Sequence, residues 1–241
     1  MYYKYTGGSH QPSYILEIMN FPSGVDLDKR TIDLELKKRS DTFGRSERQN
    51  SETNEYIIHS GFSGNISTGD KIIVEIPNKS VHSDEYRNSG YKKDERNYIA
   101  RPFHGEYYAW KKDRTETLYP LKEKLSARKT ICDVFAGALA KAVLKEFNLA
   151  VFGFAVQIGQ FHSDRRLTKK LYAIGESKGN FFEPHRFLLK NWENPYILFD
   201  DQLKVIEQYY YSPKNSAGGK FLLLIFGLPA GRAIIGKIQK N

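Results

Sequence analysis

The sequence predicts a mixed α+β fold made of antiparallel strands and a few helices. Three observations lead to this prediction. The strand-like runs 55–62 and 70–78 are joined by a turn rich in Gly, Ser and Asn, which is typical of a long hairpin. Residues 126–147 place apolar side chains on one broad helical face. The apolar runs 150–159 and 219–231 indicate buried strands, and the chain contains no internal repeat.

The elements ahead of the hairpin follow from local sequence chemistry. The run "YILEIM" at 14–19 alternates as a strand does, and a proline and a glycine then mark a turn. Segment 28–39 has two apolar residues four positions apart, and its cationic end suits a helix C-terminus. Either Asp26 or Asp28 can cap this helix. The polar segment 40–54 is expected to be a loop.

The remaining segments complete the expected order of elements. Residues 79–97 are charged without periodicity, which predicts a mobile surface loop. A further helix is expected after Asp200 or Asp201. Cys132 lies in the long helix, where a small packing residue is favoured over a nucleophile because nothing nearby argues for a lowered pKa. One domain, 1–241, is expected.

Composition limits the classes of function. A count of 37 Lys and Arg against 28 Asp and Glu gives a net charge of +9, which favours anionic partners such as nucleic acid or small phosphate and carboxylate ligands. The single cysteine excludes a disulfide framework and a Cys/His zinc site, and it favours a cytoplasmic location. No signal peptide and no membrane span are expected.

Two histidines and several arginines are candidates for chemistry. His10 in "GGSHQ" and His104 in "ARPFHGEYY" lie in turn-like settings, although an ordinary loop role is common for such histidines. Arginines recur beside glycine loops and at the start of the long helix. A cation in the first turn of a helix opposes the helix dipole, and a bound anion there would help offset this unfavourable interaction. Taken one at a time, each of these arginines is better explained as a solvated surface residue.

As a set, these motifs resemble the chorismate synthase family. "TGGSHQ" resembles "GESHG", "LKKRSDTFGRSER" resembles "RRRQGGYGRGGR", and "HSGFSGNISTGDKI" resembles "SGVxxGxTTGxPI". "ARPFHGEYY" resembles "RPGHADY", "LSARKTICDVFAGALAK" resembles "SSARETAMRVAAGAIAK", and "NSAGGKFLLLIFGLPAG" resembles "DSIGGxVEVxxxGVPAG". The six motifs occur in the family's order, and the resemblance covers nearly the whole chain.

The resemblance implies a lyase of the shikimate pathway of aromatic amino acid biosynthesis. Such an enzyme removes phosphate from 5-enolpyruvylshikimate 3-phosphate by 1,4-elimination to give chorismate, and it requires reduced FMN. His10 and His104 match the two acids, the first acting towards the leaving phosphate and the second towards the flavin. The matched substrate-binding residues are Ser9, Arg39, Arg45, Arg48, Arg101, Ser126 and Arg128. The matched flavin-binding residues are His104, Ser126 and Ala127.

The family resemblance also implies helices packed between antiparallel sheets and a homotetramer. No metal site is expected. The sequence departs from the family motifs at Gly8, Gln11, Phe103, Lys124 and Leu125. Family chains continue past the "GVPAG" turn with further flavin-binding residues, so a shortened chain or a separate C-terminal fragment is expected. The alternatives are a catalytically inactive relative that binds anions or a partner protein, and a basic nucleic-acid-binding module, which the aromatic pattern does not favour.

Overall fold

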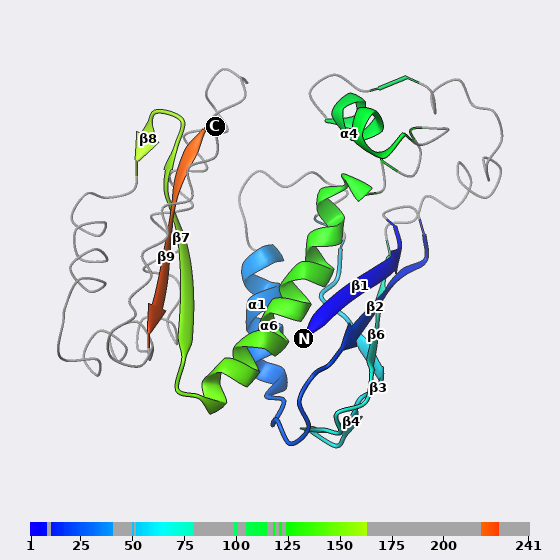
Figure 1. Cartoon of the computed structure of the whole chain (residues 1–241), viewed down its shortest axis with the longest axis vertical. Coiled ribbons are helices and arrows are strands. Elements are labelled where there is room, and N and C mark those ends of the chain that lie inside the picture. Colours follow the sequence, from blue (N-terminus) through cyan, green and yellow to red (C-terminus); the bar gives the residue numbers. More distant parts are fainter. Residues whose placement is uncertain are drawn as a thin grey trace. The chain divides into compact units, whose positions relative to one another are not determined.

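The structure is a computed structural model, and the described part of the chain falls into two compact units (Figure 1). It describes residues 1–8, 11–40, 50, 52–79, 99–100, 105–114, 118, 121, 124–162 and 218–226. Described residues up to Ala140 belong to the first unit, and the second unit begins at Lys141. This boundary falls inside a helix, and the expectation of a single domain stays a prediction.

The first unit contains a four-stranded antiparallel sheet with the order β1-β2-β6-β3. Its strands are β1 (Tyr2–Gly7), β2 (Ser13–Met19), β3 (Ile57–Ser60) and β6 (Ile72–Pro77). The expected hairpin is confirmed because β3 pairs with β6, with Ile58 opposite Val74. The strand expected at 14–19 is confirmed as β2. The edge strand β1 was not predicted.

A small ribbon forms the tip of this hairpin, from β4 (Phe62–Ser63) and β5 (Ile66–Ser67). The buried Ser67 fixes the ribbon to the turn after β2. Its hydroxyl donates to the Pro22 carbonyl at 2.7 Å and accepts from the Val25 amide at 2.9 Å. Gly61 has φ +91°, and a Cβ there would lie 2.5 Å from Cγ1 of Ile72, so this corner requires glycine.

Three helices and one 3₁₀ turn are described besides the strands. They are α1 (Lys29–Ser40), α4 (Glu106–Asp113), η2 (Ala127–Lys129) and α6 (Thr130–Glu146). Asp28 caps α1, since its Oδ1 accepts from the Arg30 amide at 3.0 Å. The long helix expected at 126–147 is confirmed as η2 followed by α6. The helix α4 was not predicted.

The core of the first unit lies between the sheet and the helices α1 and α6. Alternate residues of β2 and β6 point inward, as strand geometry requires. These inward residues are Tyr14, Leu16, Ile18, Ile72, Val74 and Ile76. The helices contribute Ile32, Leu36, Ile131, Cys132, Phe135, Ala138 and Leu139. The Tyr56 and Phe135 rings meet edge to face at 5.0 Å, which joins α6 to the segment before β3.

The second unit contains a three-stranded antiparallel sheet with the order β8-β7-β9. Its strands are β7 (Ala150–Ile158), β8 (Phe161–His162) and β9 (Gly219–Phe226), so a strand is confirmed in each of the two expected runs. The expected burial of the second strand is wrong for its described residues, because Phe221, Leu223 and Ile225 are exposed. The helix expected after Asp200 or Asp201 lies outside the described residues, as does 80–97 of the expected loop. The α+β class with antiparallel sheets is confirmed. Within the described part, no helix is both long and apolar enough to cross a bilayer.

Candidate functional site

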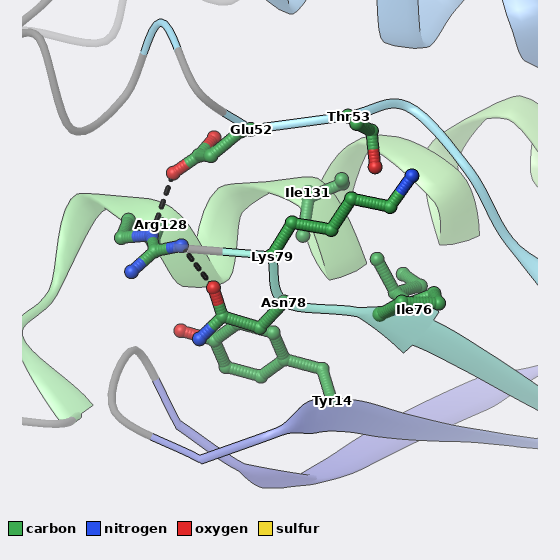
Figure 2. Close-up of a pocket in the computed structure, with 9 residues that line it drawn as sticks. Tyr14, Glu52, Thr53, Ile76, Asn78, Lys79, Arg128 and Ile131 are labelled. Atoms are coloured by element: carbon green, nitrogen blue, oxygen red, sulfur yellow. Dashed lines mark hydrogen bonds and ion pairs between the residues drawn. The ribbon is translucent and has the colours of Figure 1, made fainter. Parts of the chain in front are cut away.

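A pocket lies in the first unit where β2 and β6 approach the start of α6 (Figure 2). Its lining residues are Tyr14, Glu52, Thr53, Ile76, Pro77, Asn78, Lys79, Arg128 and Ile131. Lys79 forms an exposed ion pair with Glu55 at 2.6 Å. Among the residues that line the pocket, the buried cation is therefore Arg128, which is 7% exposed.

Arg128 is oriented by two acceptors at different nitrogens. Its Nε donates to Oε1 of Glu52 at 2.7 Å, and its Nη2 donates to Oδ1 of Asn78 (Figure 2). Its backbone amide donates to the Ser126 hydroxyl at 3.4 Å, so Ser126 is the cap of η2. Because η2 precedes α6 directly, the long apolar helix fixes the backbone from which this guanidinium projects.

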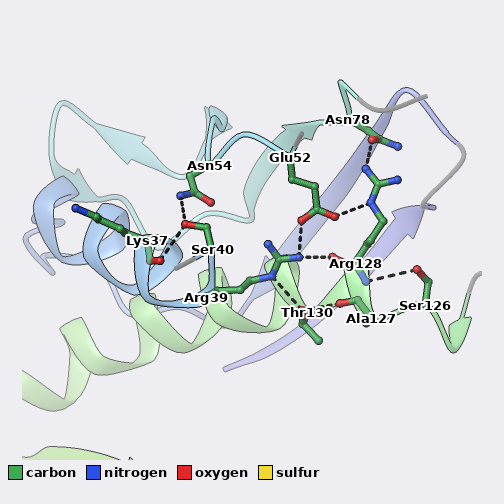
Figure 3. Close-up of polar contacts among 10 residues, drawn as sticks. All are labelled: Lys37, Arg39, Ser40, Glu52, Asn54, Asn78, Ser126, Ala127, Arg128 and Thr130. Atoms are coloured by element: carbon green, nitrogen blue, oxygen red, sulfur yellow. Dashed lines mark hydrogen bonds and ion pairs between the residues drawn. The ribbon is translucent and has the colours of Figure 1, made fainter. Parts of the chain in front are cut away.

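Arg39 reaches the same carboxylate from the last turn of α1. Its Nη2 donates to Oε2 of Glu52 at 2.9 Å (Figure 3). Arg39 follows the buried Leu36 by three positions, so both residues lie on the helix face that packs inward. This explains why the Arg39 side chain is 12% exposed although it ends a polar helix.

Further hydrogen bonds join Arg39 to the start of α6. Its Nε donates to Oγ1 of Thr130 at 3.0 Å, and its Nη2 also donates to the Arg128 carbonyl at 3.4 Å. Asn54 donates to the hydroxyl of Ser40 at 3.0 Å, which fixes the segment carrying Glu52 against the end of α1 (Figure 3). Two guanidiniums 89 positions apart in the sequence therefore share one carboxylate whose side chain is 8% exposed.

Asn78 connects this cluster to the turn between β1 and β2. Its Nδ2 donates to the Gln11 carbonyl at 2.8 Å, and its backbone amide donates to the Pro12 carbonyl at 2.8 Å. The Gln11 amide in turn donates to the Gly8 carbonyl at 3.0 Å. Positions 9 and 10 lie outside the described residues.

The structure brings together part of the expected site. Arg39 contacts Arg128, and Ser126 and Ala127 come just before Arg128 at the start of η2. The other expected residues lie outside the described part of the chain: Ser9, His10, Arg45, Arg48, Arg101 and His104. Sequence reasoning missed Glu52 and Asn78, which follow no motif quoted for the family. Their only signal was position, since Glu52 follows the arginine loop and Asn78 ends a strand.

Two interpretations of single residues can be checked directly. Cys132 is fully buried. Burial, and to a lesser extent the negative charge of Asp133, raises the pKa of its thiol to about 12. A packing role for Cys132 is therefore confirmed. Lys124, where the family has arginine, has a 62% exposed side chain that pairs with Asp113 at 2.7 Å.

Residues 1–238 match the family model described as chorismate synthase. The chain belongs to the chorismate synthase family. The chorismate synthase of Carboxydothermus hydrogenoformans is 28% identical over 236 residues, which are 95% of this chain and 58% of that protein. The chorismate synthase of Thermotoga maritima is 28% identical over 231 residues, 93% of this chain and 55% of that protein. A Thermotoga sp. strain RQ2 chorismate synthase is 35% identical over 153 residues, 64% of this chain.

A solved structure supports the same fold. A crystal structure of chorismate synthase matches with a TM-score of 0.60 at 22% identity, covering 95% of this chain and 57% of that chain. The chorismate synthase-like fold class is therefore confirmed. This chain spans about half the length of the two relatives that match nearly all of it, since the matches cover 55% and 58% of those proteins.

The described residues offer a partial test of cofactor binding in this family member. Ser126 is partly exposed and Ala127 is exposed at the capped start of η2, next to a buried guanidinium. The two residues matched to flavin contacts are therefore accessible to solvent beside a cation, which fits an anionic cofactor such as FMN. Within the described ranges, no group of three His, Cys, Asp or Glu side chains is placed to hold a metal ion.

Proposed function

We propose that this protein acts as a chorismate synthase, eliminating phosphate from 5-enolpyruvylshikimate 3-phosphate with reduced FMN as cofactor. The single observation that carries the proposal is the meeting of Arg39 and Arg128 at one buried position, because both match substrate-binding arginines of the family. The family match over 1–238 supports the same reaction.

The arginine pair suits an anionic substrate for electrostatic reasons. A guanidinium donates planar, paired hydrogen bonds that match phosphate and carboxylate geometry. The two arginines and Glu52 together carry one net positive charge, and burial lowers the effective dielectric constant, so this charge attracts a bound anion more strongly than a surface cation would. In the elimination the C–O bond to phosphate breaks, a ring hydrogen is lost, and a new double bond forms. Arg39 and Arg128 would stabilise the charge that gathers on the departing phosphate.

The remaining roles come from residue-wise matching. His10 would donate a proton to the leaving phosphate, with Ser9, Arg45, Arg48, Arg101 and Ser126 completing the substrate contacts. His104, Ser126 and Ala127 would hold the flavin. Reduced FMN, when bound, supplies electron density to the reacting substrate with no net change of oxidation state. An imidazole suits the proton-donating task because its unperturbed pKa lies near ~6.5.

Assembly and location form part of the same proposal. We propose a homotetramer, as in the family, with association with a separate C-terminal fragment as the alternative. A cytoplasmic location agrees with the single free cysteine, Cys132. Neither nucleic acid nor a membrane is proposed as a partner.

An activity assay tests the proposal. Under anaerobic conditions with photoreduced FMN, the wild-type protein should release phosphate from 5-enolpyruvylshikimate 3-phosphate, and His10→Ala should abolish release. Arg39→Lys should lower the rate of phosphate release at least about tenfold, because a lysine ammonium cannot make the paired hydrogen bonds that a guanidinium makes to phosphate. Arg30→Lys is the matched control, because Arg30 lies in the same helix but is exposed. No phosphate release by the wild-type protein would refute the activity and favour the inactive-relative alternative.

A further inference from the structure

We infer that Glu52 is a positioning residue, which holds the guanidiniums of Arg39 and Arg128 in the one orientation that binds a phosphate-bearing anion. This inference rests on the proposed function, since it concerns the same anion site. It assigns a role to a residue outside the matched motifs.

The geometry gives each carboxylate oxygen a different arginine. Oε1 of Glu52 accepts from Nε of Arg128 at 2.7 Å, and Oε2 accepts from Nη2 of Arg39 at 2.9 Å (Figure 3). The carboxylate of Glu52 therefore fixes the position of one guanidinium group with respect to the other. All three side chains are nearly buried, with exposed fractions of 8%, 9% and 12%.

Each guanidinium is planar, so two acceptors at different nitrogens define its plane. Arg39 has Thr130 at Nε and Glu52 at Nη2, and Arg128 has Glu52 at Nε and Asn78 at Nη2. Glu52 is the acceptor common to both arginines. Shortening its side chain would leave Thr130, Asn78 and the 3.4 Å contact of Arg39 with the Arg128 carbonyl in place, but it would remove the acceptor that joins the two guanidinium groups.

The charge of Glu52 acts together with this geometry. Two guanidiniums that share a buried carboxylate repel each other in a medium of low effective dielectric constant. The carboxylate between them compensates that repulsion and keeps them close. A purely electrostatic role would need only a negative charge at this position, whereas a positioning role needs the full length of the glutamate side chain.

Aspartate separates these two roles, because Glu52→Asp keeps the charge and withdraws the carboxylate by one methylene. A matched control lies on the exposed side of the same unit. Glu17 also pairs with two cations, Lys4 at 3.3 Å and Lys71 at 3.5 Å, with its side chain 25% exposed. Glu17→Asp makes the same chemical change in a doubly paired carboxylate outside the site.

Calorimetric titration with inorganic phosphate, at constant ionic strength and well below the melting temperature, tests the inference. We expect the dissociation constant to rise at least tenfold in Glu52→Asp and to stay unchanged in Glu17→Asp. A Glu52→Asp affinity within twofold of wild type would overturn the inference. Absence of phosphate binding by the wild-type protein would overturn it as well. Phosphate release from 5-enolpyruvylshikimate 3-phosphate, measured separately, decides the proposed function, so the two failures are distinguishable.

A measurement on the wild-type protein keeps the inference testable if Glu52→Asp does not fold. The Nε–H of Arg128, bonded to Glu52, should give a slowly exchanging signal in a ¹H–¹⁵N spectrum, identified by its loss in Arg128→Lys. If Glu52 positions the arginines for the ligand, saturation with inorganic phosphate leaves this signal slowly exchanging. Fast exchange of the signal on phosphate binding would mean that the anion displaces Glu52, which would overturn the positioning role.

Discussion

Replacing Glu52 by glutamine should destabilise the first unit substantially, although the change alters only one functional group. In the wild-type protein both carboxylate oxygens accept from guanidiniums, at 2.7 and 2.9 Å. The amide of glutamine has one acceptor and one donor, so one arginine would face an N–H group. The substitution also removes the only negative charge among these three buried side chains.

The magnitude follows from burial. Removing one partner from a buried ion pair costs about 3–5 kcal/mol because a charge is left uncompensated. The amide oxygen retains one hydrogen bond, so we expect the lower end, about 3 kcal/mol. For a chain of 241 residues this corresponds to a melting temperature lower by about 6–12 °C.

Urea unfolding followed by circular dichroism measures this loss, with the m-value compared between variants to confirm that stability alone has changed. Glu17→Gln is the control, because it makes the same substitution in a carboxylate that also pairs with two cations but at the solvent-exposed surface. We expect Glu17→Gln to unfold at the wild-type midpoint. A Glu52→Gln midpoint indistinguishable from that of Glu17→Gln would refute the argument that burial makes the shared carboxylate important.

Three further predictions concern the rest of the first unit. Gly61→Ala should cost more than Gly64→Ala, by about 1–3 kcal/mol in urea unfolding, because both have positive φ but only the first would crowd Ile72; equal losses would contradict this. Cys132 should not react with DTNB at pH 8 until urea unfolds the protein, since burial raises its pKa to about 12; rapid labelling of the native protein would refute this. Burial and a nearby aspartate raise the pKa of Tyr56 to about 12, above its usual 10.0. Its contribution to stability should be complete below pH 10 and lost as pH rises towards 12, and Tyr56→Phe should remove part of that loss in urea unfolding at each pH.

Elements with a clear apolar period could be predicted from the sequence, and elements formed mainly by tertiary pairing could not. The helix α6 and the strands β2 and β6 each bury one regular face, so their apolar residues recur with the expected spacing. The strand β1 buries no residue and forms by pairing with β2 along its full length. The helix α4 leaves Tyr107 and Tyr108 exposed and buries Glu106, which reverses the usual pattern.

The site divides in the same way. Arg39 and Arg128 could be selected from motifs, because their order and spacing match the family. Glu52 could not, because a carboxylate in a polar segment is most often a solvated surface residue. What distinguishes it is the fold: the inward face of α1 and the cap of η2 place two guanidiniums beside it. Only the three-dimensional arrangement shows that this acid is shared.

The sequence departs from the family motif at Gln11, and the contact that Asn78 makes there does not depend on the Gln11 side chain. An arginine nitrogen can only donate and a carbonyl oxygen can only accept, so Arg128 and Gln11 together fix which end of the Asn78 amide faces each of them. The contact to Gln11 uses its backbone carbonyl, and its side chain is exposed. A glycine there, as in the family motif, would offer the same carbonyl. The substitution at Gln11 therefore does not alter the connection from Arg128 through Asn78 to the backbone at position 11.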